Sequence, residues 1–117
     1  MPLVDQIQSD MTAAMKASDS YEYAEAVRGI AEAHSRSGRL EVALENYEKV
    51  ARLAGEIESL YLRAKALTGI AEIVLHTKGK DAARIYWREA HDIFAQIGVS
   101  EAAAVDVRLY SLSGSAS

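Results

Sequence analysis

The sequence Gly29-Ile30-Ala31-Glu32 occurs again as Gly69-Ile70-Ala71-Glu72, with every residue number raised by 40. The match extends outward from this stretch without a gap: residues 21–55 and residues 61–95 are identical at eight positions. Unrelated segments of ordinary composition would share only about two or three. The sequence therefore predicts two consecutive copies of one structural unit.

Each unit contains two stretches in which apolar residues recur at steps of three and four, as on one face of a helix. The first stretch of each unit ends near a glycine, Gly38 or Gly79, a residue that favours the left-handed conformation at a helix C-terminus. We therefore expect helix pairs in repeat 1 (20–55) and repeat 2 (56–98), with helices over 20–37, 39–54, 56–77 and 80–96. Gly55 and Gly98 are expected to end the units.

The two ends of the chain are expected to be partial units that cover the apolar flanks of a stack of repeats. Forty residues before the apolar positions of 43–54 stand Leu3, Ile7, Met11 and Ala14, which are also apolar. Residues 3–17 are therefore predicted to form an N-terminal capping helix. Residues 100–112 are predicted to form a C-terminal capping helix, and 113–117 a disordered tail. The prediction is one all-α domain (1–112) of about six antiparallel helices.

Composition argues against several classes of function. A net charge of −4, with basic residues scattered among acidic ones, disfavours a dedicated nucleic-acid binder. The chain has no cysteine and no apolar run long enough for a membrane span, so we expect a cytoplasmic protein with no membrane association. It contains no nucleophile elbow and no phosphate-binding glycine loop. We expect no enzyme activity, no cofactor and no metal site.

The first unit carries Val27-x2-Ile30-Ala31-x2-His34-x3-Gly38-x-Leu40-x2-Ala43-x3-Tyr47-x2-Val50, which resembles the tetratricopeptide repeat (TPR) pattern. The second unit is similar through Leu67, Ile70, Ala71, Val74, Ala83, Trp87 and Ala90, with its glycine one place late at Gly79. The units are longer than the repeat that is common in this family, which has about 34 residues. The resemblance implies a solenoid of helix hairpins in a short right-handed superhelix, and a protein–protein interaction (adaptor or scaffold) module.

In that register the first helix of each unit lines a concave surface. The resemblance implies that a peptide or helix of a protein partner binds there, against Glu25, Arg28, Glu32, Arg36, Lys65, Thr68, Glu72 and His76. A solvated helix face is the alternative, because Glu32 and Arg36 are spaced to pair with each other. Glu72 and His76 have the spacing of two metal ligands, but the first unit has no second histidine at the matching positions.

Two alternative functions remain open. Residues 100–112 place apolar groups on more than one side of a helix, which would suit a homodimer formed at the open end. Residues 9–19 resemble the opening helix of the YqeY family, which is related to a tail domain of tRNA-dependent amidotransferases. That likeness implies an accessory role in such chemistry.

Overall fold

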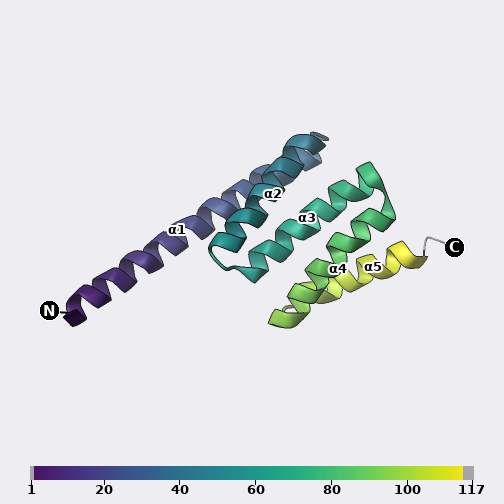
Figure 1. Cartoon of the computed structure of the whole chain (residues 1–117). Coiled ribbons are helices and arrows are strands. Elements are labelled where there is room, and N and C mark those ends of the chain that lie inside the picture. The colour runs from purple at the N-terminus through teal and green to yellow at the C-terminus, as the bar shows by residue number, and fades with distance from the viewer. Residues whose placement is uncertain (1, 115–117) are drawn as a thin grey trace.

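The computed structural model describes residues 2–114, which fold as helices joined by short turns, with no strand in that range. The prediction of an all-α chain is confirmed. The helices are α1 (Pro2–Arg36), α2 (Leu40–Glu56), α3 (Leu60–Lys78), α4 (Lys80–Ile97) and α5 (Glu101–Gly114) (Figure 1).

Helices that follow one another in the chain pack side by side, α1 on α2, α2 on α3, α3 on α4 and α4 on α5. This serial arrangement makes the molecule long, with extents of 69 × 30 × 17 Å. Its radius of gyration is 17.1 Å, whereas a compact domain of this size would have about 13 Å. The N-terminal half of α1 reaches beyond the other helices (Figure 1).

The structure has five helices in its described range, so the prediction of about six is wrong at one place. The capping helix expected over 3–17 and the helix expected over 20–37 are one continuous helix, α1. Nothing in the sequence ends a helix there, because the first glycine is Gly29 and no proline follows Pro2. Residues 4–16 are all exposed and so do not cover the apolar flank of the repeats.

The turns follow the glycines with one exception. Gly38, Gly79 and Gly98 all have positive φ values, which a residue without a Cβ adopts at little cost. The prediction that Gly55 ends the first unit is wrong, since α2 continues to Glu56 and Glu58 takes the positive φ of 56°. Residues 113 and 114, which were expected in a disordered tail, belong to α5, and residues 115–117 lie outside the described residues.

Small residues let the helices approach closely, and two aromatic side chains fill the space between them. Alanines 31, 43, 64, 71, 83 and 90 are fully buried in one apolar cluster. Tyr47 and Trp87, which correspond to each other in the two units, are both buried in it. Trp87 belongs to the core, and its neighbour Tyr86 is half-buried.

The two copies differ at one informative pair. Ile70 is 6% exposed, whereas its counterpart Ile30 is 51% exposed. α3 has α2 packed before it, and the described chain places no helix before α1. The same sequence position is therefore buried in the second unit and open to solvent in the first.

α2 and α3 approach each other closely at Gly69. A Cβ built on Gly69 would lie 2.4 Å from the ring of Tyr47, well inside van der Waals contact. The aromatic ring can therefore lie against α3 only because that position lacks a side chain. The corresponding Gly29 has nothing within 4 Å.

Gly69→Ala is expected to lower the free energy of unfolding by about 1–3 kcal/mol, as overpacking of a filled core does. The reason is steric, since the new methyl group would displace the buried ring of Tyr47. Urea denaturation followed by circular dichroism measures the change. Gly55→Ala is the matched control, because Gly55 is helical with open space around it and should gain up to about 1 kcal/mol. A Gly69→Ala variant as stable as this control would contradict the packing.

Candidate functional site

One face of the molecule carries three adjoining cavities of about 510, 290 and 340 Å³. They form a single groove, because neighbouring cavities have lining residues in common. The first and second cavities share Glu32, Tyr47, Gly69 and Glu72. The second and third share Lys65, Thr68 and Glu72. We call this surface the groove; it crosses α1, α3 and α5.

The groove gathers the residues that the sequence assigned to partner binding. Seven of the eight line its cavities: Arg28, Glu32, Arg36, Lys65, Thr68, Glu72 and His76. The eighth, Glu25, is bound to the rim through Arg28 at 3.1 Å and Lys65 at 3.8 Å. The structure thus brings all eight together, and their role in binding stays a prediction.

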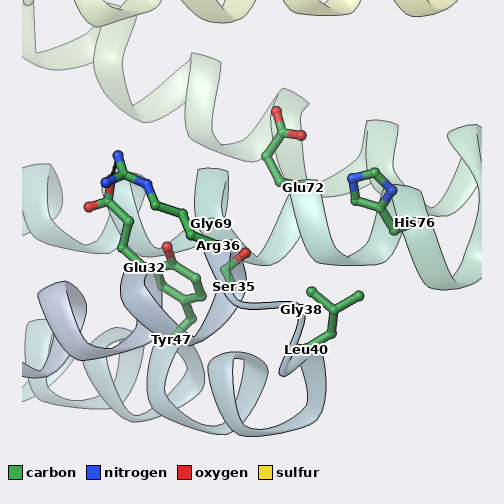
Figure 2. A pocket seen from close by; sticks show the side chains of 9 residues that line it. All are labelled: Glu32, Ser35, Arg36, Gly38, Leu40, Tyr47, Gly69, Glu72 and His76. Atoms are coloured by element: carbon green, nitrogen blue, oxygen red, sulfur yellow. Dashed lines mark hydrogen bonds and ion pairs between the residues drawn. The ribbon is translucent and has the colours of Figure 1, made fainter.

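At the first cavity, charged side chains of α1 face those of α3 (Figure 2). On α1, Arg36 binds Glu32 at 2.6 Å, and Arg28 approaches the same carboxylate at 3.6 Å. Glu72 and His76 extend from α3 across the cavity (Figure 2). The pairing of Glu32 with Arg36 that the sequence offers as an alternative is present, and both residues still line the cavity.

Tyr47 belongs to α2 and extends between α1 and α3 to line the first two cavities. Its ring lies against Gly69 and its hydroxyl points toward the side chains of Glu32 and Arg36 (Figure 2). Burial raises the pKa of the phenol, and the nearby Glu32 carboxylate raises it further. A neutral hydroxyl is therefore held at the floor of the first two cavities.

Glu25 pairs with Arg28 and Lys65, the two basic residues that line the second cavity. The hydrogen bonds from the Arg28 guanidinium, at 3.1 and 3.2 Å, hold the pKa of Glu25 below its ordinary value. Lys65 adds a smaller effect in the same direction, and partial burial opposes both. The same pairing raises the pKa of Arg28. Both groups stay ionised at neutral pH and present opposite charges along α1.

The third cavity has an apolar wall that the sequence reasoning missed. Trp87 and Phe94 of α4, with Ala104 and Val105 of α5, line it together with Arg108. Residues 100–112 were expected to form a cap or a homodimer contact, so none of the α5 positions entered the predicted groove. The repeat spacing could have indicated these positions. Arg108 lies 40 residues after the groove residue Thr68, just as Gly69 lies 40 residues after Gly29.

Two polar contacts fix α5 against α3 beside that cavity. Arg108 donates two hydrogen bonds to the Glu72 carboxylate, at 3.1 and 2.9 Å, and its guanidinium lies 5.0 Å from the centre of the Trp87 ring. The Tyr61 hydroxyl donates to Glu101. This bond raises the pKa of Tyr61 and lowers that of Glu101. α5 is thereby positioned as one wall of the groove.

Two further searches give negative results within the described range. Among residues 2–114, no group of three or more His, Asp and Glu side chains is arranged to hold a metal ion. Within the same range, no helix combines the length and the apolarity that crossing a bilayer requires.

Comparison of the chain with protein-family models, with curated proteins and with solved structures finds no match. An inference about function therefore rests on the geometry of the chain itself.

Acid should weaken the fold partly through Glu25. Because the folded-state pKa of Glu25 lies below its ordinary value of 4.5, the unfolded chain takes up the proton first as the pH falls. The stabilisation that the ionised Glu25 contributes is present above pH 4.5 and is lost as the pH drops through the lower pKa of the folded state. When the pH falls from about 7 to about 3, the free energy of unfolding of Glu25→Gln should drop less than that of the wild type. The difference between the two drops should be under about 1 kcal/mol.

Urea denaturation at several pH values measures this difference. Glu45→Gln serves as the control, because Glu45 is exposed on α2 and forms no ion pair with the described residues. It should retain the wild-type pH dependence. Identical curves for Glu25→Gln and the wild type would show that the Glu25–Arg28 contact contributes nothing to stability.

Proposed function

We propose that this chain is a protein–protein interaction module of the tetratricopeptide kind, which binds an extended peptide or a helix of a protein partner along the groove. The observation that carries the proposal is the continuity of the three cavities, which share lining residues from α1 to α5. A long, open groove suits a chain-like ligand, whereas a small molecule is usually enclosed on most sides.

The repeat geometry supports the same proposal. The helices that line the groove, α1, α3 and α5, are the first helices of successive units in the repeat register. In a right-handed superhelix of helix hairpins, first helices line the concave side, which such proteins commonly use for binding. α2 and α4 then form the outer layer, from which Tyr47 and Trp87 reach inward.

The chemistry of the groove indicates the kind of ligand. Acidic side chains alternate with basic ones, so the groove favours a partner with charges of both signs over a strongly acidic or basic segment. The neutral Tyr47 hydroxyl and the Thr68 hydroxyl offer hydrogen bonds to a peptide backbone. The third cavity would accept one apolar side chain of the partner against the exposed Ala104 and the Arg108 side chain, above the buried Trp87, Phe94 and Val105.

Charge reversal in the groove tests the proposal. A Glu32→Arg, Glu72→Arg variant should capture its protein partner from native lysate at least tenfold less than the wild type, because both carboxylates line the first two cavities. Bound proteins are quantified by mass spectrometry, and circular dichroism checks that the helices persist.

A Glu45→Arg, Glu48→Arg variant is the matched control. It makes the same charge change on the exposed side of α2, where neither residue lines the groove. The proposal expects capture equal to that of the wild type for this control. If the folded groove variant captured the same partner as strongly as the control does, the groove would not be the binding surface.

A further inference from the structure

α1 exposes a stripe along almost its whole length that the rest of the described chain leaves uncovered. Its members recur at steps of three and four, and at about 100° per residue they lie on one side of the helix. All are exposed: Val4, Ile7, Met11, Met15, Ser18, Glu22, Ala26, Gly29 and Ala33. We call these nine residues the α1 stripe.

The α1 stripe lies apart from the surface that already packs inside the chain. Ala24, Val27 and Ala31 are buried against the neighbouring helices, and they lie about half a turn around the helix from Gly29 and Ala33. A second helix could therefore bind the stripe without displacing α2.

The two halves of the stripe have different shapes. The N-terminal half carries four bulky apolar side chains, from Val4 to Met15, which are 46–65% exposed. The C-terminal half carries Ala26, Gly29 and Ala33, and a Cβ on Gly29 would meet nothing within 4 Å. Ile30, which is 51% exposed, borders this half. Bulky residues at one end thus correspond to a small-residue surface with one apolar residue at its edge at the other.

The second unit shows what such a small-residue surface accepts. Ala66 and Gly69 of α3 are the counterparts of Ala26 and Gly29 in the repeat register. There α2 packs on them: Ala66 shares a buried cluster with residues of α2, and Gly69 receives the ring of Tyr47. The C-terminal half of α1 is the same kind of helix-docking surface with its place empty.

We propose that this place is taken by α1 of a second copy of the chain, in an antiparallel homodimer with its two-fold axis beside Ser18. Antiparallel pairing about that centre brings residue i close to residue 37 − i of the other copy. Met11 then faces Ala26, and Val4 faces Ala33. Ile7 lies beside Gly29 and Ile30 of the other copy. The bulky half of each copy thus packs on the C-terminal half of the other, and the same contact occurs twice about the two-fold axis.

The alternative, parallel arrangement is unfavourable on packing grounds. It would place the bulky halves against each other and leave a gap between the small halves, so the helices could not approach evenly along their length. Antiparallel pairing fills the small surfaces with the bulky side chains. The order of large and small residues along α1 therefore selects the direction.

The size of the surface fits a weak dimer. The α1 stripe runs from Val4 to Ala33 and is about 45 Å long; a strip about 10 Å wide along it covers about 450 Å² on each copy, or about 900 Å² in total, which is the size of a weak interface.

The oligomeric state and its dependence on the stripe form the first test. Light scattering should give twice the 12.7 kDa of one chain for the wild type. Ile7→Asp, Met11→Asp should give a monomer whose unfolding transition remains, because residues 4–16 are exposed and lie outside the core of the described chain. Ser9→Asp, Ala13→Asp adds the same charges on the opposite side of that helix segment and should stay dimeric.

Cysteine cross-linking tests the direction, and the natural chain has no cysteine to interfere. Under oxidising conditions Ser18→Cys should form a disulfide-linked dimer, and so should an equimolar mixture of Met11→Cys with Ala26→Cys. Met11→Cys alone and the opposite-face control Ser9→Cys should remain uncross-linked. Cross-linking of Met11→Cys alone would show parallel pairing and would overturn the proposal.

A monomeric wild type at high concentration would also overturn it, and so would a dimer that survives Ile7→Asp, Met11→Asp. The competing surface is the outer side of α5, where Val107 and Tyr110 are 70% and 81% exposed. If Val107→Asp, Tyr110→Asp alone abolished the dimer, the interface would lie there and not on α1. The groove variant Glu32→Arg, Glu72→Arg should leave the dimer intact, which separates this test from that of the proposed function.

Discussion

The close approach of neighbouring helices at positions without large side chains is the constraint from which the rest of this structure follows. Alanines and Gly69 bring the helices near enough for Tyr47 and Trp87 to reach through the layer formed by α1, α3 and α5. Those rings fill the gaps that a serial arrangement of straight helices leaves between units. With larger residues at these positions, the helices would separate and the rings would lose their contacts.

The groove is a consequence of this packing. Because the buried apolar side chains of α1 and α3 pack with those of α2 and α4, charged residues of α1 and α3 are left in solvent on one common face. The ion pairs there are partly exposed and contribute little to stability. Their contribution is to hold Arg28, Glu32 and Arg108 in fixed positions around the Tyr47 hydroxyl and the third cavity.

The sequence predicted the helices correctly wherever the 40-residue repeat and the glycines of the turns indicated the same boundaries. It placed α2, α3 and α4 within a few residues and identified the side of α1 and α3 that lines the groove. It failed at α5, whose residues were treated as a cap, so Arg108 and Glu101 were missed. Their contacts with Glu72 and Tyr61 join residues far apart in the chain, which helical periodicity within one segment does not reveal.

The other failure, the single long α1, has a physical origin in what the sequence lacks. The apolar positions of residues 3–14 match those of a second helix, but a fold-back needs a residue that ends the helix near position 18, and Ser18, Asp19 and Ser20 do not require this. The extended helix keeps its backbone hydrogen bonds and leaves Ile30 uncovered. The apolar surface that folding back would have buried therefore stays exposed within the described chain. The complementary order of bulky and small residues on the two sides of Ser18 is the feature on which the proposed pairing with a second copy rests.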